Sequence, residues 1–510
     1  MTISTSNAQA GGRLRADLAP SPAPPPPAAP RPPSSPPGAG VTAGEPPHTV
    51  WSRFIILLLC LAVVTTTLAF GTVHAWSLAA FQLSAAIVFA LWMLDAWRTR
   101  VLRVSRNPLQ LPLVGLFVVG AVQLGASVTF DPQATRVSLI QLAGLLIYFG
   151  AALAFIDSPK RLKLMARLVV IFGFLLAVYG LMQHFVNPRT IFWVREPKQA
   201  EPFGPYVNRH HFAGYMELVL AMPLGLMFAG AVARERMLLY AFASAMMAIA
   251  LVMTNSRGGL VSMVCEILFL AAVSSLARNR RREGERLERG ERLRAAAVRV
   301  GLGFAMVLAV FVGVLYFGGE GALSRMLGTV NSADPTTGRA HFWSGTLQII
   351  RDHPLLGTGL GSFGSVYTRY DTGNGTYRLE QAHNDYLQIF SDAGVVGGLL
   401  GVVFVFLLFR TALRRMQSPD RFRRGVALGA LAGCAGALVH SFFDFTLHTT
   451  ANALMFLLLA ALATADGRVE EREEGPRRRR RRRRRHEGSD ASDEEGAHAP
   501  AAAEKEGAAA

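Results

Sequence analysis

Four side chains in this sequence are suited to chemistry on an anionic substrate, namely His383, Arg209, Arg257 and Arg339. The imidazole of histidine is well suited to general-base catalysis near neutral pH, so a neutral His383 could accept a proton from a hydroxyl group. Guanidinium groups bind phosphate and stabilise negative charge on a leaving group. Ordinary helix-end contacts are the alternative for each arginine, and an incidental polar role is the alternative for His383.

The elements that must position these residues are apolar segments long enough to cross a bilayer. The chain has 510 residues, of which 51% are hydrophobic and only 17% are charged. Globular chains carry roughly 25% charged residues, so this composition favours a membrane protein. We expect an all-α integral membrane protein. Its transmembrane helices, about twelve in number, are predicted near 52–72, 76–97, 108–128, 137–156, 164–184, 211–232, 237–254, 259–277, 300–318, 394–410, 425–443 and 449–466.

The distribution of Lys and Arg predicts the orientation of these helices. Basic residues collect in the connections that follow the even-numbered segments, and the odd-numbered connections hold few. The positive-inside rule then places both termini in the cytoplasm, and we expect the protein in the inner membrane. The net charge of +17 therefore reflects topology, and no nucleic-acid partner is expected. Arg209 and Arg257 lie in outward connections against this bias, which indicates an anionic ligand such as a phosphate at the outer face.

Two tails and one large loop complete the predicted organisation around a membrane domain of residues 51–466. Residues 1–50 are rich in Pro and Ala, and residues 467–510 contain an unbroken run of arginines over 477–485. Both are expected to be disordered cytoplasmic tails, the second in contact with anionic lipid. The first apolar run does not have the form of a cleavable signal peptide. Residues 319–393 form a large periplasmic loop with helical patterning over His341–Ile350, and a loop of that length is uncommon unless it is functional.

The segment around His383 predicts a short helix at the membrane surface. A helix over Asn384–Ala393 would hold His383 at its N-terminus, near the lipid headgroups. Gly394, Gly397 and Gly398 follow, and small residues of this kind permit close helix packing.

Neither a metal site nor a disulfide is expected. Several further histidines lie in the outer connections or at their edges, but their spacing matches no metal-ligand pattern: His210, His211, His341, His353 and His448. The three cysteines each lie in a different apolar segment, which favours ordinary packing: Cys60, Cys265 and Cys434. We therefore expect no cofactor.

Four motifs resemble those of bacterial O-antigen ligases and the related O-antigen polymerases and protein O-oligosaccharyltransferases. HNDYLQIFSDAGVVG, beginning at His383, has the His-Asn pair, nine residues and Gly-x-x-Gly of that superfamily. TNSRGGL around Arg257 resembles its Ser-Arg-Gly element. The stretch GRAHFWSGTLQIIRDHPLLGTGLGSF around Arg339 and the segment NRHHFAGY around Arg209 resemble two further elements. The resemblance covers roughly residues 200–450.

The resemblance implies an activity and its substrates. The family is a group of inverting, metal-independent glycosyltransferases of the C-type membrane architecture. The implied donor is a glycan on undecaprenyl diphosphate, and the implied acceptor of an O-antigen ligase is lipid A–core, with membrane lipids as surroundings. Polymerization of O-antigen or exopolysaccharide and protein O-glycosylation are the alternatives within the family. An activated diphosphate needs no nucleotide, and the sequence contains no nucleotide-binding fingerprint.

The resemblance also implies roles for individual residues. His383 would be the base that activates the acceptor hydroxyl, and Arg257 and Arg339 would hold the diphosphate leaving group. Asn384 would orient His383. Two residues at the start of the sixth segment are weaker assignments to the substrate site: Asn208 and Arg209.

Two functions of other classes compete with a glycosyltransferase. Twelve helices with both ends inside also suit a membrane transporter, but a transporter is expected to place charges at mid-membrane and to contain repeats. Here the apolar segments are nearly free of charge, and no repeat relates the two halves. A peptidoglycan polymerase would use an acidic catalytic residue in the large loop, a role for which Asp385 is the candidate.

Overall fold

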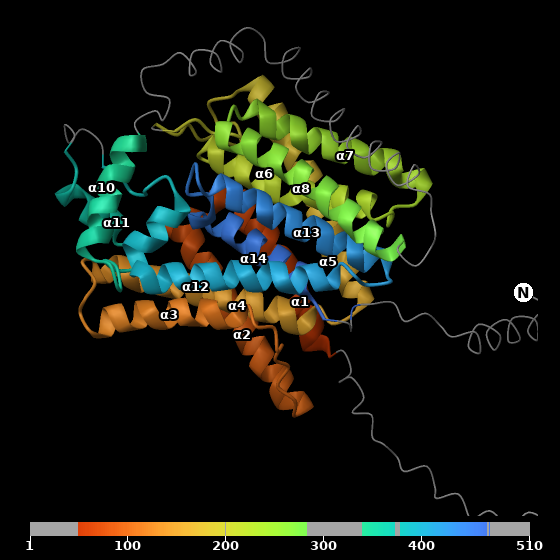
Figure 1. The fold of residues 1–510 in the computed structure, drawn as a ribbon, viewed down its shortest axis with the longest axis horizontal. Coiled ribbons are helices and arrows are strands. Elements are labelled where there is room, and N and C mark those ends of the chain that lie inside the picture. The colour runs from red at the N-terminus through yellow and green to blue at the C-terminus, as the bar shows by residue number, and fades with distance from the viewer. Residues whose placement is uncertain (1–48, 199, 283–338, 373–377, 467–468, 470–510) are drawn as a thin grey trace, which may run out of the picture. The chain divides into compact units, whose positions relative to one another are not determined.

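The computed structural model describes residues 49–198, 200–282, 339–372, 378–466 and 469 (Figure 1). The two predicted tails, the ninth predicted segment at 300–318 and residues 319–338 of the large loop lie outside these described residues.

Long helices dominate the described part of the chain, and they correspond to the other eleven predicted segments. They are α1 (Val50–Leu68), α2 (Ala75–Thr99), α3 (Gln110–Gly125), α4 (Pro132–Phe155), α5 (Pro159–Val186), α6 (Arg209–Phe228), α7 (Arg234–Met253), α8 (Arg257–Arg282), α12 (Asp385–Arg415), α13 (Arg421–His440) and α14 (Thr450–Thr464). Among the described residues, nine of these helices are long and apolar enough to span a membrane, and α3 and α14 are shorter apolar helices. The protein is an all-α integral membrane protein.

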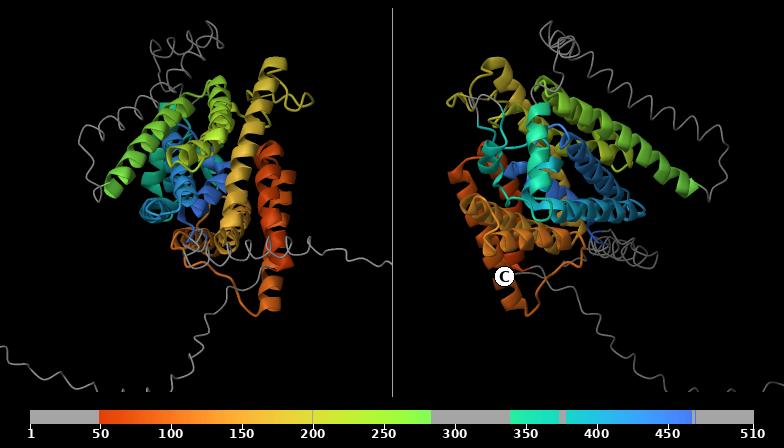
Figure 2. Two further views of the ribbon diagram at one scale, coloured as in Figure 1. Left: turned by 90° about the vertical axis from the view of Figure 1, so that its right-hand side faces the viewer. Right: turned by 60° about the vertical axis from the view of Figure 1, so that its left-hand side comes forward.

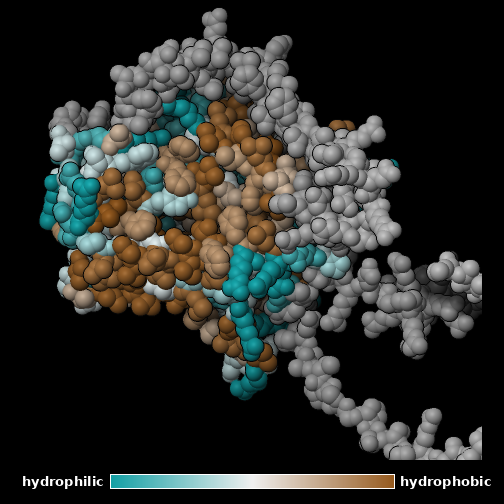
Figure 3. Space-filling view, viewed as in Figure 1, coloured by the Kyte–Doolittle hydropathy of each residue, from teal (hydrophilic) through white to brown (hydrophobic). Residues whose placement is uncertain are grey.

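Helices α6 and α13 form the centre of the bundle. Their backbones touch, because a Cβ atom added at Gly225 would lie only 2.3 Å from the backbone nitrogen of Gly429. Most of α6 is buried, whereas helices further out expose large apolar side chains such as Leu238 and Phe406. Figure 3 shows a broad brown, hydrophobic surface over the bundle, which is suited to contact with lipid.

The described part of the predicted large loop is helical, as the patterning over His341–Ile350 indicated. It contains α10 (Arg339–Asp352), α11 (Phe363–Val366) and the 3-10 helix η2 (Tyr367–Arg369). These elements lie at one end of the bundle, at the left in Figure 1, where Figure 3 shows polar surface. Helix α10 packs beside α12, as Figure 2 shows. We call this the site end.

Helix α12 joins the predicted surface helix and the tenth predicted segment across a bend at Gly394 (φ 62°, ψ −163°). The bend frees the amides of Val395 and Val396 from helical acceptors, and they donate instead to the carbonyls of Pro354 (2.8 Å) and Leu355 (3.3 Å). The predicted close packing at Gly394 is therefore against a loop backbone and not against another helix. The next glycines, 397 and 398, face the first part of α12 itself.

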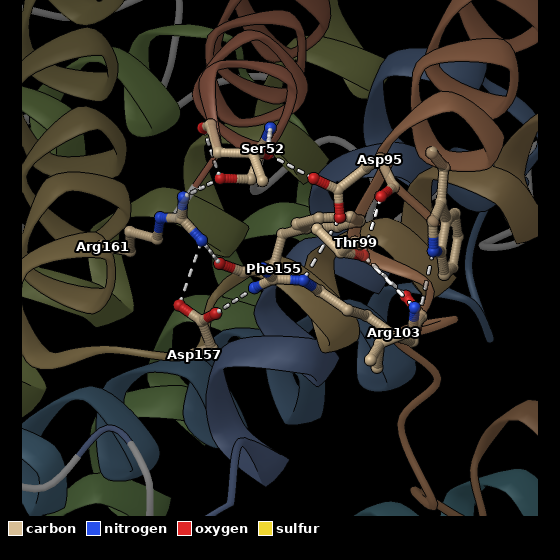
Figure 4. Close-up of polar contacts among 10 residues, drawn as sticks. Ser52, Asp95, Thr99, Arg103, Phe155, Asp157 and Arg161 are labelled. Carbon is tan, nitrogen blue, oxygen red and sulfur yellow. Dashed lines mark hydrogen bonds and ion pairs between the residues drawn. The ribbon is translucent and has the colours of Figure 1, made fainter. Parts of the chain in front are cut away.

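The opposite end of the bundle is held by a buried network of charges, shown in Figure 4. Arg103 contacts Asp95 (Nε to Oδ2, 3.2 Å) and Asp157 (Nη1 to Oδ2, 3.3 Å). Arg161 also contacts Asp157 (3.1 Å) and donates to the hydroxyl of Ser52 (2.8 Å). Arginines that the sequence presents as topology signals thus also fasten α1, α2, α4 and α5 together. We call this the basic end.

Candidate active site

The three predicted arginines meet in one cavity at the site end. Each is the first residue of a helix: Arg209 of α6, Arg257 of α8 and Arg339 of α10. The cavity has a volume of about 220 Å³ and is lined by Arg209, His210, Asn255, Ser256, Arg257, Gly258, Arg339, His440, Phe443 and Asp444. Helix N-termini carry a partial positive charge, so the N-termini of α6 and α8 add to the arginine charges. The cavity is electrostatically suited to an anion.

The turn between α7 and α8 places Arg257 through the individual residues of its motif. Asn255 has a positive φ of 54°, a conformation that asparagine tolerates better than most residues. The Ser256 hydroxyl accepts a hydrogen bond from the amide of Gly259 (3.3 Å) and so caps α8, and it also contacts Nδ1 of His210 (2.9 Å). The motif therefore sets a tight turn, a helix start and an arginine at the cavity.

His383 lies one hydrogen bond away from the cavity wall. Its Nδ1 atom is 3.2 Å from Oδ1 of Asp444, and the other carboxylate oxygen of Asp444 is 3.5 Å from Nη2 of Arg339. An ionised carboxylate only accepts hydrogen bonds, so the shared proton belongs on Nδ1 and the lone pair of His383 on Nε2. The rings of Phe342 and Phe445 lie 6.0 and 4.8 Å from the imidazole. This arrangement presents Nε2 as a proton acceptor.

Asp444 is buried, with its side chain 2% exposed. Burial raises the pKa of Asp444, but the hydrogen bond from His383 and nearby positive charge outweigh burial and hold this pKa well below its usual range. The group is therefore a carboxylate at neutral pH, as the hydrogen bond to Nδ1 of His383 requires.

A chain of hydrogen bonds fixes the backbone that carries His383, which has a positive φ of 50°. The Gln388 side chain accepts from the amide of Ala382 (2.7 Å) and donates to the carboxylate of Asp392 (3.2 Å). Asp392 in turn accepts from the amide of Gly361 (3.0 Å). The glycine-rich stretch near residue 360 therefore supports His383 through the first turns of α12.

The two predicted asparagines serve as helix caps. Asn384 caps α12 by accepting from the amides of Tyr386 and Leu387, and it donates to the carbonyl of Phe442 (3.1 Å). Asn208 caps α6 by accepting from the amide of His210 (2.9 Å). Asp444 is the residue that hydrogen-bonds to the His383 ring, and the resemblance implied only that Asn384 orients His383. Asn384 still fixes the start of the helix that His383 precedes.

The Arg209 guanidinium forms an ion pair with Glu201, a largely exposed residue in the connection before α6. Asp385, the candidate of the peptidoglycan-polymerase alternative, accepts from Ser441 (2.8 Å) and contacts Nδ1 of His448 (2.6 Å). Asp385 thus anchors the loop after α13. Among the described residues, no group of three or more His, Cys, Asp or Glu side chains is arranged to hold a metal ion.

A protein-family model matches the part of the chain that contains Arg257, Arg339 and His383. Residues 242–402 match a family model described as O-antigen ligase. This match supports membership of the O-antigen ligase and polymerase family. No curated protein matches the chain.

This O-antigen ligase region runs from α7 to α12 and contains Arg257, Arg339 and His383. Membership supports a ligase-type or polymerase-type function in general, and with it a glycosyltransferase-type enzyme that uses a lipid-linked glycan and an acceptor. Arg209 and Asp444 lie outside the matched region, so helices before and after it complete the cavity.

The sequence analysis did not identify two residues of the candidate site. Asp444 was one of several outer acidic residues, and nothing local links it to His383, from which it is separated by 61 positions. His440 was placed inside the eleventh segment, but α13 ends at His440, and its ring lines the cavity. The alternation of inner and outer connections was the available signal. It puts the last residues of α13 on the same side of the membrane as the first residues of α8 and α12.

Proposed function

We propose that the protein transfers a glycan from undecaprenyl diphosphate to a hydroxyl group of lipid A–core at the periplasmic face of the inner membrane. The observation that carries this proposal is the convergence of three arginines on one cavity, with a histidine bound to Asp444 of its wall. The arginines bind the diphosphate, and His383 acts on the acceptor. The family match supports the reaction class, and the finer assignment of donor and acceptor is our own.

The cavity is suited to a compact anion. At about 220 Å³ it is smaller than the roughly 300–1,000 Å³ pockets that enclose drug-sized ligands. It therefore accommodates the diphosphate, while the glycan and the polyprenyl chain extend outside. Arginine charge and helix N-termini stabilise the negative charge that grows on the departing diphosphate, a role that metal ions fill in other enzymes. On this basis we propose a metal-independent reaction.

Acceptor activation follows from the state of His383. With its Nδ1 proton directed at Asp444, the Nε2 atom takes the proton of the acceptor hydroxyl as the oxygen attacks the anomeric carbon. The bond from that carbon to the phosphate oxygen breaks, and its electron pair leaves with the diphosphate. Because attack is direct and no enzyme nucleophile intervenes, we expect inversion at the anomeric carbon.

The test uses the purified full chain in lipid nanodiscs with an undecaprenyl-diphosphate-linked glycan and lipid A–core that carries no O-antigen. We expect His383→Ala to lower the rate by roughly 10²–10⁴-fold, as for loss of a general base. We expect Arg257→Ala or Arg339→Ala to lower it by roughly 10²–10³-fold. Activity should survive EDTA, and product anomers can be assigned by NMR spectroscopy.

Matched controls come from the same end of the molecule. His353 contacts the ring of Phe130 and Arg378 pairs with Glu380, and both lie outside the cavity. His353→Ala and Arg378→Ala should therefore keep near-normal activity. Full activity in the His383→Ala and Arg257→Ala variants would refute the proposal.

Product analysis separates a ligase from a polymerase of the same family. Loss of all long-chain glycan from lipopolysaccharide in a His383→Ala strain indicates ligation. Loss of chain extension, with single repeat units still attached, indicates polymerization, and transfer to a protein acceptor indicates O-glycosylation.

The structure also bears on the transporter alternative. The predicted segments are not as free of charge as the sequence reading assumed, because Glu217 of α6 and Glu266 of α8 are fully buried. Glu217 pairs with His440 beside the arginine cavity at the site end. Glu217 therefore lies directly behind the wall of the proposed diphosphate site.

A further inference from the structure

His440 and Glu217 form a buried pair that the reaction described above does not use. Nδ1 of His440, the last residue of α13, is 2.8 Å from Oε1 of Glu217 in α6. The two side chains are 1% and 0% exposed. Histidine and glutamate are rarely buried to this degree in a membrane domain without a functional reason.

The second ring nitrogen of His440 has no protein hydrogen-bond partner among the described residues. His440 lines the cavity, and this nitrogen, Nε2, is buried. Buried polar atoms are nearly always paired, so an orphaned nitrogen in a cavity wall indicates a ligand that pairs with it. The arginines in the same wall indicate that this ligand is an anion.

The two glycines after Arg257 make room for this pair. A Cβ atom at Gly258 would lie 2.9 Å from Nε2 of His440, and a Cβ atom at Gly259 would lie 3.2 Å from Oε1 of Glu217. Side chains at these positions would crowd the imidazole or the carboxyl group. The Arg-Gly-Gly sequence therefore brings the arginine and the histidine to the same wall.

We infer that Nε2 of His440 donates a hydrogen bond to the diphosphate of the lipid-linked donor, with Glu217 holding the imidazole from behind. This inference rests on the proposed function and adds a catalytic residue to it. The His440–Glu217 pair can hold two protons in two forms, imidazolium with carboxylate or neutral imidazole with carboxylic acid. In both forms one proton is on Nε2, and the other is shared between Nδ1 and Glu217. Its total charge is zero in both forms, which avoids the cost of burying a lone cation.

The hydrogen bond from Nε2 of His440 stabilises the negative charge that develops on the diphosphate during transfer. As the glycosidic carbon–oxygen bond breaks, the electron pair moves onto the diphosphate, and the Nε2 hydrogen bond strengthens with it. The acceptor proton goes to His383, so His440 keeps its own proton and the reaction balances without it.

Two substitutions at His440 separate its role as a hydrogen-bond donor from its role in packing. The amide nitrogen of glutamine reaches the position of Nε2, and that of asparagine reaches only the position of Nδ1. The matched control is Glu266→Gln, because Glu266 is a fully buried acid in α8 whose carboxyl oxygens have no hydrogen-bond partner among the described residues.

The experiment measures binding of farnesyl diphosphate to the full chain in nanodiscs, together with glycan transfer and thermal stability. We expect His440→Asn to weaken binding roughly tenfold or more, the loss expected for a hydrogen bond to a charged group. His440→Gln and Glu266→Gln should bind within about threefold of the unmodified protein, since a donor at Nε2 remains. His383→Ala should bind normally and fail in transfer.

Three outcomes would count against the inference. If His440→Asn binds normally while Arg257→Ala does not, His440 is not a ligand, although the proposed function stands. If folded His440→Asn and His440→Gln weaken binding equally, the donor at Nε2 is excluded. If the unmodified protein neither binds farnesyl diphosphate nor transfers glycan, the proposed function fails, and the role of His440 fails with it.

Discussion

At the scale of single residues, Asp444 connects the two halves of the proposed chemistry. Its carboxylate contacts His383 through one oxygen and Arg339 through the other, at 3.2 and 3.5 Å. The same group therefore fixes the imidazole and partly offsets arginine charge in the cavity. Catalysis and anion binding should respond in opposite directions when that charge is removed.

We predict that Asp444→Asn lowers the turnover number by roughly 10²-fold or more, because the wrong His383 tautomer becomes accessible. Binding of farnesyl diphosphate should stay the same or tighten, since one negative charge leaves the cavity. Rate and binding measured on the same preparation check both parts. A variant that loses binding and rate together would indicate a collapsed site instead of a misplaced histidine.

His448 and Asp385 form a second pair, at the loop after α13, whose Nδ1 to Oδ1 distance is 2.6 Å. Burial lowers the pKa of His448, but the hydrogen bond and charge of Asp385 outweigh it, and the net pKa is raised. A raised folded-state pKa gives stability that is fully present below the unfolded pKa of about 6.5. That stability is lost as pH rises through the folded value.

We therefore predict that His448→Gln lowers the unfolding temperature more at about pH 5.5, below the unfolded pKa, than at about pH 9, because the contribution of the pair is lost as pH rises through the raised folded-state pKa. Thermal unfolding in detergent at both pH values measures the difference. An equal loss at both values would show that the His448 contribution is packing and not charge.

At the scale of elements, the bend in α12 aims its first turns, and with them His383, at the cavity. Gly394 adopts backbone angles that are essentially restricted to glycine, and the freed amides are satisfied by the stretch around Pro354. A Cβ atom at Gly394 would lie 2.2 Å from the carbonyl oxygen of Leu355. The bend and the loop beside it therefore require each other.

We predict that Gly394→Ala destabilises the protein by about 3 kcal/mol or more, from a strained backbone combined with a steric clash. Gly401→Ala is the matched control in the same helix, because the nearest atom to its added Cβ is 3.9 Å away. Unfolding in detergent compares the two variants. Equal stability of both would contradict the proposed restriction at the bend.

The charged network at the basic end is the second element-scale feature. Asp157 contacts both Arg103 and Arg161, and all three side chains are at most 10% exposed. Removing one member of a buried ion network leaves charge without compensation.

We predict that Asp157→Asn costs about 3–5 kcal/mol of stability, because two buried guanidinium groups lose a shared carboxylate. Glu380→Gln, which breaks an exposed pair with Arg378, should change stability little. Denaturation curves of both variants test this, and a small effect of Asp157→Asn would show that water or the remaining Asp95 compensates.

Apolar length and charge placement predicted more of the elements than of the site. The predicted ends of most helices agree with the observed ends to within about five residues. A long apolar run such as α5 can be accommodated only across the bilayer, which limits where it begins and ends. The positions of Arg209 and Arg257 were informative for a physical reason, because cations in outward connections oppose the positive-inside rule. The contacts of Asp444 and of the His440–Glu217 pair could not be predicted, because they join residues far apart along the chain. The bend at Gly394 was also missed, since glycine spacing alone does not distinguish a bend from close packing.

At the scale of the whole molecule, the two ends of the bundle differ in chemistry. The arginine cavity and α10 lie at the site end, and the ion network joined by Asp157 lies at the basic end. We propose that the site end faces the periplasm and that the basic end, with both termini, faces the cytoplasm. The sides can be tested directly because each end offers exposed positions.

We predict that Ser344→Cys in α10 reacts with a membrane-impermeant maleimide in intact cells from which the outer-membrane barrier has been removed. Val104→Cys, at an exposed position in the connection after α2, should react only after the cells are opened. Labelling is compared with the unmodified chain, which retains three cysteines within helices. The reverse pattern would invert the proposed orientation.

The position of Asp444 also bears on how the protein is made. The first arginine of the cavity is residue 209, but the carboxylate that holds His383 comes more than 230 residues later, after α13. A chain still on the ribosome can insert most of its helices and remain catalytically inert. On the proposed mechanism, incomplete chains therefore do not consume lipid-linked precursors, because competence for transfer arises only after α13 has been made and Asp444 has been added.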